Sequence, residues 1–417
     1  MIQSSPSQLV RFLRTHQTVF AICVTTCVTM MGQGVIAPVL PLFAKEFDVG
    51  VAMIGFTIAV FGLGRFFTNI PAGLASERYG RRRVMLAGLL IVTISSLLMA
   101  LSHSFLELVI YRFTTGIGNA IYLTSAITVL ADISTQENRA RYMSLQQGSL
   151  LLGVGIGPGL GGLAAEFWGF RSAFYLLTLL TAIGLVWIFF RMPETSSTRP
   201  TEAAGKTESK GALSRPERSS FMSILANMNF ILVSFYFFMI VFTRNGGRGS
   251  IVPLLGDAQA SIGPGEIGFA FTVMALVNFV MVVPAGWFSD RYGRKALMLP
   301  SAIVSAIGLF LYIGTTGFPM FMISSVILGI GAGLAGPSPL AFISDIAPVD
   351  RRGSAVGLFR TYGDLGGIVG PIALGWVVDV ATFGWALNIN IALVLLSGLL
   401  VAAFAKEPRR TRVEAQM

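Results

Sequence analysis

The chain has 417 residues, of which 54% are hydrophobic and only 12% are charged, and its mean hydropathy is +0.73. A water-soluble domain carries about 25% charged residues, so this composition excludes an ordinary soluble protein and favours one that lies largely within a membrane. The formal net charge of +10 would suit a nucleic-acid partner or a membrane surface, and the positions of the basic residues decide between the two.

Twelve apolar stretches follow one another along the chain, and each is long enough, at about 20 residues, to cross a bilayer as a helix. Their approximate bounds are residues 18–42, 51–76, 83–102, 106–132, 140–166, 169–191, 222–246, 263–288, 295–314, 318–345, 353–379 and 383–404. The sequence therefore predicts an all-α membrane protein with twelve transmembrane helices.

The two halves of the chain repeat each other. The stretch PAGLASERYGRRRVML begins at Pro71 and returns as PAGWFSDRYGRKALML at Pro284, an offset of 213 residues. Parallel repeats in a very apolar chain are typical of transporters that hold their substrate between the halves, near the bilayer midplane. We predict two pseudo-symmetric six-helix bundles, residues 1–191 and 221–417.

A polar segment, residues 192–220, separates the two bundles and is rich in Ser, Thr, Glu, Lys, Arg and Pro. It has no apolar period, so we predict a flexible cytoplasmic linker rather than an additional domain.

The basic residues predict the topology. If both termini are cytoplasmic, 23 of the 30 Lys and Arg residues lie in cytoplasmic segments, whereas the loops on the other side hold Lys45 and Arg171. This bias follows the positive-inside rule. We expect a multi-pass protein of the plasma (inner) membrane with both termini in the cytoplasm, and we attribute the net charge to this topology rather than to nucleic-acid binding.

The most specific local pattern is the loop that follows the second apolar stretch and recurs after the eighth. Residues 73–82 read GLASERYGRR and residues 286–295 read GWFSDRYGRK. Glycines permit a tight reversal between helices, and the basic cluster favours the cytoplasmic side. A plain stop-transfer cluster is the alternative, but the recurrence at one offset argues against it.

This loop resembles the signature loop of the major facilitator superfamily, and the resemblance covers essentially the whole chain. It implies the twelve-helix fold and a loop that locks the cytoplasmic faces of the two halves together in the outward-open state. The first copy has Glu77 where the family usually has Asp. The implied gating residues are Gly73, Glu77, Arg78, Gly80, Arg81, Asp132 and Arg139 in the first half, and Gly286, Asp290, Arg291, Gly293, Arg294, Asp345 and Arg352 in the second.

The fifth apolar stretch carries Gly153, Gly157 and Gly161 one helical turn apart, which clears a face for close helix contact. Residues 157–162 also satisfy G-x-G-x-x-G, but no strand precedes them, so we reject dinucleotide binding. With Pro158 and Gly162, the fuller pattern resembles the antiporter motif of drug:proton antiporters and implies proton-coupled export. Small-residue packing without that function is the alternative.

An arginine in a membrane span is costly and usually faces the protein interior or water. Arg112 is followed by a glycine four residues later, which resembles the family's fourth-helix motif, whose arginine is associated with proton coupling. The alternative is an arginine near the helix end that extends its charge to the membrane surface.

Asp364 is the best candidate for a proton carrier or for the counter-charge of a cationic substrate. It interrupts an apolar run, one turn after Arg360. Burial disfavours its charged form, whereas a cationic neighbour favours it, so its protonation can respond to pH. A structural ion pair with Arg360 is the alternative.

Several other polar residues fall inside predicted spans and provide donors and acceptors for a substrate. Arg65 and Asn278 are equivalent in the repeat. We expect Gly246 and Gly247 to break the seventh helix near its outer end, where Arg244 and Arg248 would line a vestibule and favour anions. The remaining candidates are Gln33, Asn69, Asn119, Tyr122, Gln146, Gln147, Tyr236, Asn245, Asn388 and Asn390.

These observations predict a secondary active transporter that exports small amphipathic compounds or drugs by proton antiport, with the proton gradient as its energy source. The first span carries no acid, unlike many drug:proton antiporters, so Asp364 would have to recognise a cation. The alternatives are an importer or facilitator of an anionic metabolite, and a membrane receptor or scaffold that no longer transports. We predict no enzyme activity, cofactor or metal site, and we expect a monomer.

Overall fold

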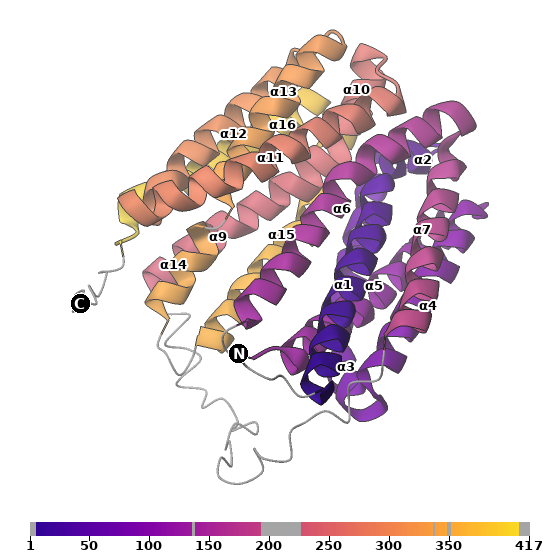
Figure 1. The fold of residues 1–417 in the computed structure, drawn as a ribbon. Coiled ribbons are helices and arrows are strands. Elements are labelled where there is room, and N and C mark those ends of the chain that lie inside the picture. Colours follow the sequence, from indigo (N-terminus) through magenta and orange to yellow (C-terminus); the bar gives the residue numbers. More distant parts are fainter. Residues whose placement is uncertain (1–5, 136–137, 193–226, 337, 348–351, 408–417) are drawn as a thin grey trace.

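The computed structural model describes residues 6–135, 138–192, 227–336, 338–347 and 352–407, and over these ranges the chain is helical, with no strand (Figure 1). Twelve helical segments in this part of the chain are long and apolar enough to cross a membrane. The predicted fold class is confirmed. Except for Met192, the predicted linker at 192–220 falls outside the described residues.

The first half contains seven helices that make six spans. They are α1 (Pro6–Val35), α2 (Val39–Lys45), α3 (Val51–Tyr79), α4 (Arg81–Ala100), α5 (Phe105–Ile133), α6 (Arg139–Trp168) and α7 (Phe170–Arg191). A turn separates α1 from α2 within one span.

The second half makes six spans from a larger number of segments. They are α9 (Met228–Phe242), η2 (Thr243–Ile251), α10 (Val252–Ala260), α11 (Pro264–Tyr292), η3 (Lys295–Leu297), α12 (Met298–Ile313), α13 (Phe318–Ala335), α14 (Ser338–Ile346), α15 (Arg352–Val380) and α16 (Phe383–Phe404).

The seventh span differs from its prediction. Gly246 and Gly247 do not break it. Instead the helix widens to π-type hydrogen bonding over η2 and continues through α10, so the span runs to Ala260 rather than ending near residue 246. The glycines serve close packing, because a Cβ on Gly246 would collide with the backbone of Gly370 in α15.

The repeated loops turn at equivalent glycines. Gly80 has a φ of 94° and Gly293 a φ of 104°, a region that L side chains rarely adopt. Each glycine ends one helix and begins the reversal into the next, so the tight turn predicted from the sequence depends on this residue.

The outer surface of the helices is apolar. Ile70 and Phe190 are each 77% exposed, and exposed large hydrophobic side chains occur on most of the spans. A water-soluble protein would not carry so much exposed apolar surface, whereas lipid solvates it. The chain is an integral multi-pass membrane protein.

The two halves meet along two helix pairs, α3 with α15 and α6 with α11. These contacts follow the repeat: a Cβ on Gly55 would collide with the carbonyl of Pro371, and one on Gly268 would collide with the carbonyl of Pro158. Close backbone approach at all four positions holds the halves together.

The contacts between the halves lie toward one end, which we call the closed end, where α2 and α10 are found (Figure 1). There Lys45 Nζ lies 2.8 Å from Asp257 Oδ2. Asp379 Oδ1 and Oδ2 accept from the backbone N–H of Val51 at 2.6 Å and Ala52 at 2.9 Å.

Toward the other end, where α1 begins and α16 ends and which we call the terminal end, the halves diverge (Figure 1). A Cβ built on Gly148 of α6, Gly286 of α11 or Gly357 of α15 would meet no atom within 4 Å. The described helices therefore form two bundles that are joined at the closed end and separated at the terminal end.

Candidate functional site

Asp364 lies near the middle of α15, at the boundary between the halves. One turn closer to the closed end than Asp364, α15 contacts α3: a Cβ built on Gly62 of α3 would lie 3.3 Å from Ile368 of α15. Arg65 of α3 and Asp364 of α15 lie one turn from this contact, on the side of the terminal end. The carboxylate interacts electrostatically with Arg65 of α3, Arg244 of η2 and Arg360 of its own helix.

The central charges are accessible although they lie far from the ends of their helices. Both Asp364 and Arg244 are exposed. In the described residues no ion pair within 4.0 Å joins Asp364 to Arg360 or to the other two arginines, so the predicted alternative of a direct structural pair with Arg360 does not form.

A first group of side chains, the N-terminal cluster, is linked by contacts with the Phe61 ring and with Arg112. Its members are Gln33, Phe61, Arg65 and Arg112. The Arg112 guanidinium carbon lies 4.4 Å from the ring centroid and that of Arg65 lies 6.0 Å away. Arg112 Nη1 donates to Gln33 Oε1 at 3.4 Å. Arg112 is 7% exposed, so it faces the bundle interior and does not extend to the membrane surface.

A second group, the C-terminal cluster, consists of Arg244, Arg248, Phe271 and Met274. The Arg248 guanidinium carbon lies 5.6 Å from the Phe271 ring centroid, and its Nη1 lies 3.8 Å from Met274 Sδ. Because the seventh span continues to Ala260, both arginines lie near its middle and not near its outer end. The predicted position near the outer end is wrong, and Arg244 instead lies close enough to Asp364 to interact with it electrostatically.

Most of the buried polar groups without a partner near these clusters are hydrogen-bond donors. In the part of the chain that the structure describes, no acceptor meets the Nε atoms of Arg65, Arg112 and Arg248, the Nε2 of Gln33 or the Nδ2 of Asn119. A buried donor without a partner costs about 1–3 kcal/mol, so water or a ligand has to satisfy these groups.

Other polar candidates lie away from the central charges. Tyr122 hydrogen-bonds Thr26 at 2.9 Å and Tyr236 bonds Ser301, each inside the core of its own half. These two hydroxyls already have partners and hold helices of one half together.

The polar residues of α16 and α6 divide between buried and exposed faces. Asn390 is buried and accepts from Thr243 Oγ1 at 2.8 Å, whereas Asn388, two residues earlier, is exposed. Two residues turn a helix by about 200°, so Asn390 and not Asn388 approaches η2. On α6, Gln146 is buried and Gln147 is exposed.

Asn278 and Asn69 lie on the helices that join the halves. Ala275, one turn before Asn278 on α11, is within 3.6 Å of a Cβ built on Gly155 of α6. Asn278 is half-buried at this crossing, as Asn69 is on α3. In η2, Asn245 Nδ2 donates to the carbonyl of Gly367 at 3.4 Å. The repeat therefore places Asn278 at the α6–α11 crossing as it places Arg65 at the α3–α15 crossing.

Several of the predicted gating residues form ion pairs within their own half. Asp132 Oδ2 pairs with Arg81 Nε at 2.9 Å, while Arg78 lies against the Tyr79 ring and Glu77 and Arg139 have no described partner among side chains. In the described part of the chain, Arg78 takes part in no ion pair. Because the terminal ends of the halves are apart, these side chains hold only their own bundle.

The second half repeats this arrangement. Arg294 donates to Asp345 Oδ2 at 3.2 Å and also to Asp290, while Arg291 lies against Trp287 and Tyr292. Partial burial lowers the pKa of Arg294, but its hydrogen bonds with Asp345 and Asp290 outweigh that effect and raise the pKa above its ordinary value. The side chain of Arg352 lies outside the described part of the chain.

The predicted glycine motif on α6 makes close contacts on two sides. A Cβ on Gly153, Gly157 or Gly161 would collide with α1 backbone at Cys27, Met31 and Val35. On the other side, a Cβ on Gly162 would collide with Pro264 of α11, in the other half. The motif therefore joins α1, α6 and α11.

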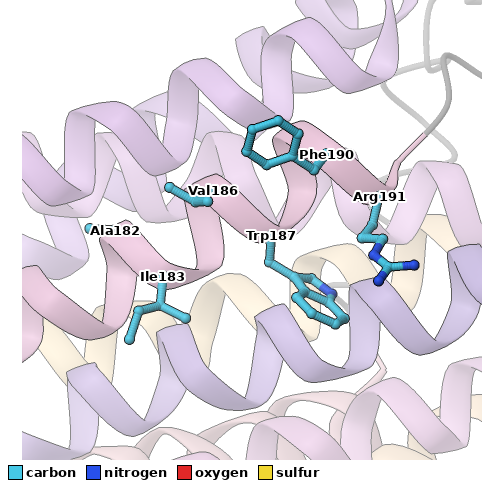
Figure 2. A pocket seen from close by; sticks show the side chains of 6 residues that line it. All are labelled: Ala182, Ile183, Val186, Trp187, Phe190 and Arg191. Atoms are coloured by element: carbon cyan, nitrogen blue, oxygen red, sulfur yellow. The ribbon is translucent and has the colours of Figure 1, made fainter.

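One surface pocket lies elsewhere and belongs to a single helix. Figure 2 shows its lining, Ala182, Ile183, Val186, Trp187, Phe190 and Arg191, all on α7. Ile183, Val186 and Phe190 are exposed apolar residues, so this pocket faces the lipid and lies apart from the central charges.

Comparison with known proteins agrees with the fold. The family model described as Major Facilitator Superfamily matches residues 22–246 and 237–416. Multidrug resistance protein 2 of Bacillus subtilis is 27% identical over 381 residues, which cover 88% of this chain and 90% of the relative. An uncharacterized MFS-type transporter of Methanocaldococcus jannaschii is 25% identical over 370 residues, which cover 88% and 92%.

A solved structure shares the fold at much lower identity. It is a bacterial homologue of the human lysosomal transporter Spinster in an inward-facing and occupied conformation. The TM-score is 0.78 at 14% identity, and the match covers 92% of this chain and 95% of that one.

Proposed function

Since the chain belongs to the Major Facilitator Superfamily and is a membrane transporter, we propose that it couples the passage of small amphipathic compounds to the passage of protons. The two bundles would alternate between opening at the terminal end and opening at the closed end, around the central charges. One chain holds both halves of the pathway, so we propose that it acts as a monomer, with the proton gradient as energy source.

The position of Asp364 carries this proposal. It is an exposed acid near the middle of a membrane span and interacts electrostatically with three arginines. The other acids within the described spans lie within about two turns of a helix end. A carboxyl group in a low-dielectric interior is expensive to keep ionised, and nearby arginines reduce that cost. Such a group can bind a proton on one side and release it on the other.

Two directions of coupling are open to such a site. The glycine pattern of α6 resembles that of drug:proton antiporters, and the name of the Bacillus relative points the same way, which favours export in exchange for protons. The excess of arginine over acid favours a different partner, an anion that moves with the proton. We also propose that the terminal end faces the cytoplasm of a cell whose plasma (inner) membrane holds the protein.

The test uses the full chain in proteoliposomes with a pH-sensitive dye inside. Charged amphipathic compounds are added outside without a pre-formed pH gradient, and the lumen pH is recorded. Asp364→Asn keeps the shape of the side chain and removes its proton site. Asp48→Asn is the matched control, because Asp48 lies in an exposed loop and its φ of 52° is one that Asn tolerates.

We expect substrate-dependent pH changes in the wild type and in Asp48→Asn, and their loss in Asp364→Asn with the protein still folded. Equal pH changes in Asp364→Asn and the wild type would refute the assignment of the proton to Asp364. Substrate flux in the wild type without any pH change would refute proton coupling itself.

A further inference from the structure

The central region contains more positively charged than negatively charged side chains. Arginines 65, 112, 244, 248 and 360 lie within the spans. Asp364 interacts electrostatically with three of them, Arg65, Arg244 and Arg360. No described ion pair within 4.0 Å involves any of them. An uncompensated charge in a low-dielectric interior is costly, so the site is built to receive negative charge.

The hydrogen-bond donors without an acceptor also favour a negatively charged ligand. The Nε atoms of Arg65, Arg112 and Arg248 are buried without an acceptor. Guanidinium groups hold carboxylates and related acids through parallel N–H donors. These arginines come from both clusters, so both halves of the protein contribute donors without an acceptor.

The clusters also provide an apolar environment. Phe61 covers one face of the Arg112 guanidinium and Phe271 lies against that of Arg248. An arginine stacked on a ring still presents its N–H groups at the guanidinium edge. A ligand with an acidic group and an aromatic body would contact both features at once.

We propose that this site binds a small organic anion with an aromatic body, and that the anion moves in the same direction as the proton of Asp364. The proposal rests on the proposed proton-coupled transport and specifies its substrate class and direction. The anion would be held by the arginines of the two clusters.

The coupling follows from shared arginines. Asp364 interacts with Arg65 and Arg244, which are also members of the two clusters. An anion at these arginines repels an ionised carboxylate and takes over its positive partners. Anion binding and protonation of Asp364 therefore favour each other, and this coupling is reciprocal. A cationic substrate would instead compete with the proton and give exchange.

The test compares two fluorescent probes of similar size and permanent, opposite charge: naphthalene-2-sulfonate and N-methylquinolinium. Binding to the detergent-purified full chain is measured by probe fluorescence. Lumen pH is measured in proteoliposomes. We expect the sulfonate to bind and to acidify the lumen as it enters, and the quinolinium to do neither.

Variants locate the binding site. Arg248→Gln should raise the half-saturating sulfonate concentration on the order of 10- to 100-fold, as expected when a hydrogen bond to a charged group is lost. Arg248→Lys keeps the positive charge but loses the parallel N–H donors of the guanidinium group. Its half-saturating sulfonate concentration should lie between those of the wild type and Arg248→Gln. Arg191→Gln, at an exposed helix end beside Trp187, should match the wild type.

The outcomes separate the two proposals. Tighter binding of the quinolinium, or sulfonate affinity unchanged in folded Arg248→Gln and Arg244→Gln, overturns the anion site. Lumen alkalinisation when quinolinium enters indicates exchange and overturns the shared direction. If the sulfonate binds through Arg248 and never changes the lumen pH, the anion site stands and proton-coupled transport fails.

Discussion

The carboxylate of Asp379 is predicted to hold the closed end shut. It lies at the end of α15 and accepts hydrogen bonds from Val51 and Ala52, the first two residues of α3 in the other half, at 2.6 and 2.9 Å. A negative charge at a helix N-terminus stabilises by about 0.3–1 kcal/mol, and a capping hydrogen bond by about 0.5–2 kcal/mol. The contact is exposed, so we take the total as about 1–2 kcal/mol.

The repeat provides a matched control for this contact. Glu166 is equivalent to Asp379 and lies against the N-terminus of α11, close to Gly265. That N-terminus offers fewer donors, because Pro264 has no N–H and the N–H of Gly263 is taken by Glu266 Oε2 at 3.3 Å. Asp379→Ala should therefore weaken the closed end more than Glu166→Ala does.

The assay is a distance distribution between spin labels on the two halves. Labels at Glu46→Cys and Gln259→Cys, both exposed near the closed end, would be attached after the native Cys23 and Cys27 are replaced by Ser. Asp379→Ala should shift the ratio of closed to open populations about 5- to 30-fold toward open, the equivalent of about 1–2 kcal/mol, and Glu166→Ala less than about 2-fold. Equal shifts for the two variants, or none for Asp379→Ala, would refute this account.

Two further predictions concern stability. Gly161→Ala should lower the unfolding temperature and Gly155→Ala should not, because a Cβ on Gly161 collides with α1 backbone while one on Gly155 lies 3.6 Å from its nearest neighbour; equal unfolding temperatures would contradict the packing. Arg81→Gln should destabilise by about 1–3 kcal/mol and Arg78→Gln by less than about 0.5 kcal/mol in chemical unfolding, since Arg81 pairs with Asp132 and Arg78 lies exposed. A larger effect at Arg78 than at Arg81 would contradict the pairing of Asp132 with Arg81.

The architecture was predictable from the sequence because hydropathy and repetition operate over many residues. Each apolar stretch that the sequence indicated corresponds to a described span, with ends displaced by a few residues in most cases. The seventh span was the exception. Its Gly246-Gly247 pair is typical of a break, but the space that α15 requires beside Gly246 depends on tertiary contacts, which the local sequence does not encode.

Side-chain partners were harder to predict than helices. The family resemblance named Asp132, Arg78 and Arg81 as gating residues without assigning pairs. Arg78 and Arg81 lie less than one turn apart, and only the turn at Gly80 determines which of them faces Asp132. Asn388 and Asn390 presented the same difficulty. Both lie in one apolar run, and only the rotation of α16 against η2 selects Asn390.

Residues that keep the 213-residue offset between the halves differ in position from residues that do not keep it. Gly55 and Gly268, Pro158 and Pro371, and the acids at the closed end keep the offset and make the contacts between halves. The central charges do not keep it: Arg65 corresponds to Asn278, Arg112 to Ser325 and Asp364 to Leu151. Helices that move against each other as equivalent bundles need equivalent contacts, whereas a ligand without that symmetry needs different groups from each half. In a chain of this kind, the charged residues within the spans that have no charged equivalent in the other half are therefore the best candidates for binding the substrate and the proton.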